Sequence, residues 1–295
     1  MMNLNGLGVA MVTPFNKNGA VDYPALQRTT EHLIKSDCDF LVVLGTTAET
    51  PTLSVEEQRS ALDFIIELNN KRLPIVVGLA GNNTSALCKR ISEFDFKGVD
   101  AVLSASPHYN KPSQAGIIQH FKMVADASPK PVVLYNVPSR TGSNMSAGTT
   151  LELAKHKNII AVKEASGDLG QVDEIIRNRP EGFLVFSGDD ALTLAMIASG
   201  ADGVISVIGN ALPKRFGSMV QQALFGQVIE ARETHHLLSP IIEAIFEEGN
   251  PAGIKSVMST IGLCEDLVRL PLVPATPDLK KKLYSCLADL EVEIA

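Results

Sequence analysis

Residues 159–167 read Ile-Ile-Ala-Val-Lys-Glu-Ala-Ser-Gly, an apolar run that ends in a lysine and then in a small polar turn. A short run that is apolar at consecutive positions is typical of a strand buried on both faces, as in a parallel sheet covered by helices. Similar runs recur along the chain, each followed by a polar cluster and a helical pattern. In chain order the predicted strands span residues 7–12, 40–44, 75–77, 101–103, 132–135, 159–162, 183–186 and 204–207.

The segments between these runs carry apolar residues at the spacing of helices, most clearly at 22–36 and 113–127. The stretch Ser54-Val55-Glu56-Glu57 matches a capping box, in which a serine and a glutamate three residues later cap the start of a helix. Eight alternating strand and helix units predict an α/β protein with a closed (β/α)8 TIM barrel. An open doubly wound sheet is the alternative.

From Pro213 onward no run is typical of a strand, and helical patterns continue to Ala295. Breaks are expected near Ser239-Pro240, Gly249-Asn250-Pro251 and residues 274–277. This segment is too long for a single barrel helix. We therefore expect residues 1–212 to supply the barrel strands and the catalytic face, and residues 213–295 to form the last barrel helix plus a C-terminal helical extension.

The composition argues against several classes of protein. The chain has 295 residues, 45% hydrophobic and 20% charged, with a net charge of −7 and no basic patch, so no nucleic-acid partner is expected. No apolar run approaches the roughly 18 residues of a membrane span, and the first residues lack the pattern of a leader, which favours a cytoplasmic protein without a membrane partner. The six histidines and four cysteines show no metal-ligand spacing, so no metal site is predicted.

In such a barrel the functional groups come from the carboxyl ends of the strands. Lys163 stands at one of these ends, and period-two alternation places it on the face of the small residues Ala161 and Ala165. If that face points inward, burial favours the neutral amine, which is the nucleophilic form. On spacing alone, a Schiff-base role and a structural pairing with an acid both stay open, although the adjacent Glu164 faces the other way.

Other strand ends offer complementary chemistry. Tyr135 could relay protons to an amine on the next strand, or simply bury its ring and bond a backbone carbonyl. Thr46 and Thr47, which follow Gly45, present hydroxyl and N–H groups that suit a carboxylate, although such pairs are also common as plain caps. Arg140 could bind a second carboxylate through two parallel hydrogen bonds, or be a solvated surface residue.

Taken together, five motifs resemble the pyruvate-dependent aldolase family that includes dihydrodipicolinate synthase and N-acetylneuraminate lyase. The resemblance runs in order over essentially the whole chain and is specific as a set, although each motif alone is not. Arg140 favours the synthase branch, because that arginine is not expected in the neuraminate lyase. The motifs are Gly-Thr-Thr at 45–47, Ser-Pro-His-Tyr-Asn-Lys-Pro at 106–112, Tyr-Asn-Val-Pro-Ser-Arg-Thr-Gly at 135–142, Val-Lys-Glu-Ala-Ser-Gly at 162–167 and Ser-Gly-Asp-Asp at 187–190.

The resemblance implies a condensation of pyruvate with L-aspartate 4-semialdehyde to give 4-hydroxy-tetrahydrodipicolinate, in the diaminopimelate route to lysine. It implies that Lys163 forms an imine with pyruvate and that Tyr135 is the proton donor and acceptor beside it. Thr46 and Tyr109 would complete the proton relay, with Tyr109 reaching in from a neighbouring subunit. The covalent imine on Lys163 is itself the electron sink, so no cofactor is expected.

The family also implies two binding roles and an assembly. Thr47, with the backbone at Ile205, would hold the pyruvate carboxylate, and Arg140 would receive the carboxylate of the semialdehyde. A relay that needs a partner's tyrosine implies a homotetramer built as a dimer of dimers. Two rivals remain: another pyruvate-dependent aldolase (a 2-keto-3-deoxy sugar acid aldolase or the neuraminate lyase), or a non-catalytic pyruvate-sensing protein.

The sequence departs from the family pattern in two places. Ala48 stands where a glycine often follows Gly-Thr-Thr, which is tolerable unless the backbone there needs a positive φ. Lysine-inhibited relatives line an interface site with histidine, glutamate and tyrosine, and here the glutamate is replaced by Ala86. We therefore expect lysine to inhibit weakly or not at all. The positions aligned with that site are Val55, Gln58, Ala86 and His108, while Asn82 is kept.

Overall fold

The computed structural model describes residues 4–36 and 38–292. The first three residues, part of the segment searched for a leader, and the last three residues of the expected C-terminal extension lie outside this range. Eight strands form a closed parallel barrel in chain order, which confirms the predicted fold class and rules out the open sheet. The strands are β1 Gly6–Ala10, β2 Phe40–Val43, β3 Ile75–Gly78, β4 Ala101–Ala105, β5 Val132–Asn136, β6 Ile159–Glu164, β7 Leu184–Ser187 and β8 Gly203–Ser206.

The barrel closes where β8 pairs with β1, and this junction depends on a close backbone approach. Gly203 pairs with Gly6 and has a φ of +149°, outside the range that other residues readily adopt. A Cβ atom at Gly203 would lie 2.1 Å from the carbonyl oxygen of Gly6. Glycine is therefore needed for the two strands to meet.

Each strand buries two faces, which explains the continuous apolar runs in the sequence. An inner cluster fills the barrel and includes Val42, Val76, Val133, Ala161 and Ile205. A larger cluster lies outside the strands, between them and the helices. Lys163 lies two residues beyond Ala161, so its side chain belongs to the inner face, as the alternation predicted.

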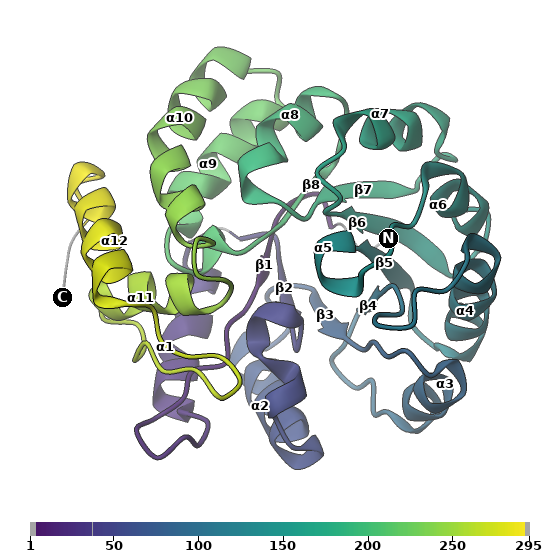
Figure 1. The fold of residues 1–295 in the computed structure, drawn as a ribbon, viewed down its shortest axis with the longest axis horizontal. Helices are drawn as coiled ribbons and strands as arrows, with labels where there is room; N and C mark the ends of the chain where they lie inside the picture. Colours follow the sequence, from purple (N-terminus) through teal and green to yellow (C-terminus); the bar gives the residue numbers. More distant parts are fainter. Residues whose placement is uncertain (1–3, 37, 293–295) are drawn as a thin grey trace.

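Helices surround the strands, and α9 to α12 gather on one side of the barrel (Figure 1). The last of these, α12, packs on α10 and α11. No helix among the described residues is long and apolar enough to cross a membrane. The helices are α1 Tyr23–Ile34, α2 Val55–Asn69, α3 Thr84–Glu93, α4 Gln114–Ala127, α5 Pro138–Thr141, α6 Ala147–Leu153, α7 Leu169–Asn178, α8 Thr193–Ala198, α9 Pro213–Leu224, α10 Val228–Ala244, α11 Ala252–Thr260 and α12 Pro277–Asp289. Short 3-10 helices are η1 Thr46–Ala48, η2 Thr50–Thr52, η3 Asp190–Leu192 and η4 Ile208–Asn210.

The helix starts follow the capping signals in the sequence. The Ser54 side chain accepts from the backbone N–H of Glu57, and the Glu57 side chain accepts from the backbone N–H of Ser54, so the predicted capping box is confirmed. Asp22 and Ser113 cap α1 and α4 with one bond each, in which the side chain accepts from the backbone N–H of Ala25 or Gly116. These caps satisfy N–H groups that have no partner within the helix.

The expected break at Ser239-Pro240 is wrong, because α10 continues through Pro240. The proline removes one backbone donor, but both Pro240 and the residue four before it, His236, are exposed, so water can reach the freed carbonyl. Leu238 and Ile241 are buried on the opposite face and hold the helix against its neighbours. The other two expected breaks coincide with the gaps before α11 and α12.

Candidate active site

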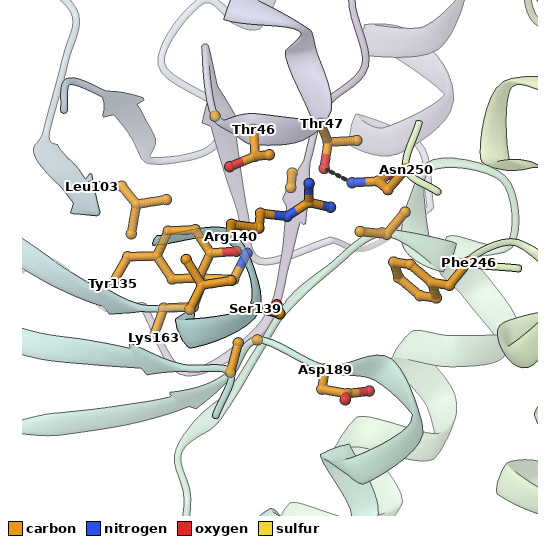
Figure 2. A pocket seen from close by; sticks show the side chains of 16 residues that line it. Thr46, Thr47, Leu103, Tyr135, Ser139, Arg140, Lys163, Asp189, Phe246 and Asn250 are labelled. Carbon is orange, nitrogen blue, oxygen red and sulfur yellow. Dashed lines mark hydrogen bonds between the residues drawn. The ribbon is translucent and has the colours of Figure 1, made fainter. Parts of the chain in front are cut away.

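A cavity of about 180 Å³ opens at the carboxyl ends of the barrel strands. It brings together five of the residues selected from the sequence, which come from three different strand ends or the turns that follow them: Thr46, Thr47, Tyr135, Arg140 and Lys163. Figure 2 shows Lys163 beside the Tyr135 ring, with Thr46 close to the same ring.

Lys163 is buried at the base of this cavity, with 5% of its surface exposed. The pKa of its ammonium is lowered to about 8, mainly by burial; the Asp190 carboxylate opposes the shift and Arg140 adds to it. Gly188 leaves room for the side chain, because a Cβ atom there would lie 3.0 Å from the Lys163 Cε. The arrangement therefore raises the fraction of neutral, nucleophilic amine near physiological pH.

Glu164 is not the partner of Lys163. Its carboxylate faces away from the cavity and accepts hydrogen bonds from the Asn136 side chain at 3.0 Å, from the Ser166 backbone N–H at 2.8 Å and from the Gln171 side chain at 3.1 Å. Glu164 therefore does not form the structural ion pair with Lys163 that the sequence had left open.

Tyr135 stands on β5 directly opposite Lys163 on β6, and the Lys163 Nζ lies 4.5 Å from the centroid of its ring. Burial raises the pKa of Tyr135, while Arg140 and the Thr46 side chain oppose this rise. The phenol is therefore neutral at pH 7, close to the amine and in the neighbourhood of a second hydroxyl, that of Thr46.

The turn after β2 carries Thr46 and Thr47 in η1. The Asn250 Nδ2 donates to the Thr47 Oγ1 at 2.9 Å, which leaves the Thr47 hydroxyl proton free to donate into the cavity. Ala48 lies within η1, and the left-handed φ of 54° falls on Glu49 instead. The extra methyl group of Ala48 therefore causes no backbone strain, as expected.

Arg140 lies in α5, the short helix after β5, and its guanidinium extends across the cavity toward Thr47 and Asn250 (Figure 2). It is exposed, yet it lines the cavity and does not point away into solvent. A guanidinium in this place can form paired hydrogen bonds with a carboxylate on a molecule bound above Lys163.

Ile205 lies on β8 with its side chain in the inner cluster, and Val207, two residues later, lines the cavity. The backbone that follows is fixed by Asp190, whose carboxylate accepts from the N–H groups of Val207 at 3.0 Å and Ile208 at 2.7 Å. Burial raises the pKa of Asp190 to about 6. The neighbouring Asp189 caps η3, because its carboxylate accepts from the backbone N–H of Ala191 at 3.0 Å.

Tyr109 is not brought into this cavity by its own chain. Its side chain is 85% exposed, and its φ is 75° in the loop after β4. A second cavity of about 540 Å³ lies next to the first and shares Tyr135, Thr46 and Arg140 with it, and His108 lines its wall. Tyr109 thus faces outward from the region beside the active site.

A family model described as the dihydrodipicolinate synthetase family matches residues 3–290. The chain belongs to this family. A 4-hydroxy-tetrahydrodipicolinate synthase of Phocaeicola vulgatus is 50% identical over 98% of each chain, and that of Azobacteroides pseudotrichonymphae is 52% identical over 92% of each. The solved dihydrodipicolinate synthase from Aquifex aeolicus superposes with a TM-score of 0.94, at 37% identity over 99% of each chain. The chloride-inhibited enzyme from Acinetobacter baumannii, complexed with pyruvate, gives 0.95 at 35% identity over 99% of this chain and 100% of that one.

In this member of the dihydrodipicolinate synthetase family, the cavity also includes residues that the motifs did not reveal. Phe246 and Asn250 line it, and both come from the segment after the barrel strands. Only a predicted chain break at Asn250 hinted at a special position. Within the described residues, no group of three histidine, cysteine, aspartate or glutamate side chains is placed to hold a metal ion.

Proposed function

We propose that this chain is a class I aldolase-type lyase, a 4-hydroxy-tetrahydrodipicolinate synthase that condenses pyruvate with L-aspartate 4-semialdehyde in the diaminopimelate route to lysine. The observation that carries the proposal is the buried Lys163, which has a lowered pKa and lies beside the Tyr135 ring in a cavity that Thr46 also lines. The names of the relatives support the same reaction.

In the first half of the reaction, the neutral Lys163 amine attacks the ketone carbon of pyruvate. The first adduct passes a proton from its nitrogen to its oxygen and becomes a carbinolamine, which loses water when one more proton is delivered to the leaving hydroxyl and so becomes a protonated imine. Tyr135, beside the amine, moves these protons, with Thr46 as the next hydroxyl in the relay. Thr47 binds the pyruvate carboxylate through its free hydroxyl proton, together with backbone groups near Ile205.

In the second half, the protonated imine loses a proton from the pyruvate methyl group and becomes an enamine. The enamine carbon attacks the aldehyde of the semialdehyde, whose carboxylate is held by Arg140. The amino group of the new chain then attacks the imine carbon, closes the ring and releases Lys163. The protonated imine accepts the electron pair at each stage, so the residues of the cavity complete this reaction without a cofactor.

The proposed enzyme is a homotetramer in the cytoplasm. Tyr109 is the residue that argues for the assembly, because it completes the relay only if it enters the cavity of a neighbouring subunit. A dimer of dimers would provide such a neighbour to every chain.

We also propose that lysine inhibits this enzyme weakly or not at all. One solved relative, from Cyanidioschyzon merolae, carries bound lysine. In this chain Ala86 stands where a glutamate would meet the cationic amine, and the described lining of the second cavity contains Arg90 but no carboxylate. Strong suppression of turnover by low-millimolar lysine would contradict this.

The test of the reaction is pyruvate consumption by the purified protein with three acceptors supplied in parallel. We expect consumption with aspartate 4-semialdehyde, and none with N-acetylmannosamine or glyceraldehyde. Lys163→Ala should abolish it, and Lys157→Ala, which changes an exposed lysine, should leave it unchanged. Consumption with a sugar aldehyde instead would keep the lysine chemistry but reject the semialdehyde and the role given to Arg140.

A further inference from the structure

A fully buried ion pair lies outside the cavity, between the barrel and the C-terminal segment. The Lys255 Nζ on α11 donates to the Glu49 Oε1 at 2.6 Å, and neither side chain is exposed to solvent. The two residues are 206 positions apart in the chain. Nothing in the proposed chemistry uses either of them directly.

The surrounding groups hold both charges in one arrangement. Lys255 also donates to the carbonyl oxygen of Leu267 at 2.8 Å, and its Nζ lies 4.2 Å from the centroid of the Phe15 ring. The second oxygen of Glu49 accepts from the backbone N–H of Arg269 at 2.9 Å. Each oxygen of the carboxylate thus has its own donor, and the direction of the Glu49 side chain is fixed.

Glu49 is placed where its direction decides the geometry of the active site. It follows η1 immediately, closes that turn in the left-handed conformation, and donates its backbone N–H to the Thr46 carbonyl oxygen at 3.1 Å. The same C-terminal segment also contacts the turn through Asn250, which donates to the Thr47 hydroxyl oxygen. The C-terminal segment therefore contacts the turn that carries both threonines at two points, through Asn250 and through Lys255.

The stability of the protein does not by itself require charges here. Removing two charges from water is costly, and a well-packed apolar pair of similar volume often serves the fold equally well. What an apolar pair lacks is direction, because packing contacts do not orient a backbone as a set of hydrogen bonds does. The buried pair is thus better explained by the orientation of the turn than by stability.

We propose that Lys255 is a positioning residue of the active site, which acts through Glu49 to hold the η1 turn so that Thr47 meets the pyruvate carboxylate and Thr46 meets Tyr135. This inference rests on the proposed roles of the two threonines. It predicts that loss of Lys255 changes pyruvate binding and turnover together, although Lys255 touches neither substrate.

The test uses Lys255→Met and the double variant Lys255→Met/Glu49→Gln in the full-length protein. The single change leaves a buried carboxylate without its cation and can impair folding, whereas the double change removes both charges at similar volume. We expect the double variant to fold, with a raised KM for pyruvate and a lowered kcat, each on the order of ten-fold or more, because small misplacements of catalytic groups are costly. Lys282→Met, which breaks an exposed pair with Glu247, should keep the parent values.

A mutant cycle separates positioning from a general structural effect. In a Thr47→Val background, the double change should raise the KM for pyruvate little further, because the group it positions is already gone. Parent-like kinetics in the double variant, full additivity with Thr47→Val, or failure of both variants to fold would each overturn the proposal. Borohydride trapping of pyruvate on the parent protein checks the imine separately, so a parent that traps no pyruvate would instead reject the proposed function.

Discussion

The amine of Lys163 is subject to three influences that the structure makes explicit. Burial is the largest, and it disfavours the ammonium; the Arg140 guanidinium acts in the same direction, and the Asp190 carboxylate acts against both. The result is a pKa of about 8, which leaves roughly a tenth of the amine neutral at pH 7. Arg140, which we propose binds the second substrate, thus also acts on the Lys163 amine.

The rate of imine formation should therefore rise with pH and reach half its maximum near the lowered pKa of about 8. The direction follows because deprotonation creates the nucleophile. Rapid mixing with pyruvate, quenching into borohydride at one fixed pH and intact-mass detection would isolate this step.

Asp190→Asn provides the matched control for that pH profile. The Asp190 carboxylate raises the pKa of Lys163, so its neutralisation should move the midpoint to lower pH. A midpoint close to the ordinary lysine value of about 10.4 in the parent, or an upward movement in the variant, would contradict the electrostatic account.

At the scale of elements, the strands were predictable because a strand buried on both faces leaves an uninterrupted apolar run. The pairing of Tyr135 with Lys163 was not, since it depends on an irregularity between β5 and β6. Val132 pairs with Ile159, but Val133 pairs with Ala161, so one residue of β6 is passed over. With regular pairing, Tyr135 would face Val162 instead, and the alternation rule contains no signal for such a shift.

The same limit applies to α10, where a local rule predicted a break and tertiary packing prevailed. Pro240 withholds one hydrogen bond from an exposed position, whereas the apolar face of the helix is buried along its length. Intrinsic preferences of this kind are routinely overridden when a helix has a core to cover.

Pro240→Ala should accordingly raise the free energy of unfolding, by about 1–2 kcal/mol, because alanine restores the missing N–H and removes the clash of the ring. The greater freedom of the unfolded chain offsets part of the gain. Urea unfolding followed by circular dichroism would measure the change. Pro277→Ala, at the first turn of α12 where proline is favourable, is the control and should not stabilise. An unchanged or lower free energy of unfolding for Pro240→Ala would mean that Pro240 does not destabilise α10.

At the scale of the whole molecule, the motifs identified the cavity but not what supports it. Asn250 and Lys255 meet residues of the η1 turn that are more than 200 positions earlier in the chain. Such contacts depend on how the C-terminal segment lies against the closed barrel, and no local pattern encodes that placement. The strand-end residues were predictable because the barrel itself brings the strand ends together.

Tyr109 is the residue whose role depends on the assembly, and two inactive variants can reveal it. If Tyr109 acts in the cavity of a neighbouring subunit, then Lys163→Ala and Tyr109→Phe should each lose most activity alone. When the two variants are co-expressed, a mixed pair contains one intact site, formed by Lys163 of one chain and Tyr109 of the other. Random pairing makes about half of the pairs mixed, so about a quarter of all sites should recover.

Turnover per purified chain measures the recovery. The control is co-expression of Lys163→Ala with Tyr284→Phe, which changes another exposed tyrosine. This control should yield only the activity of the sites that keep Lys163. If the two inactive variants regain nothing together, Tyr109 either acts within its own chain or has no part in the relay, and the main argument for an obligatory oligomer is lost.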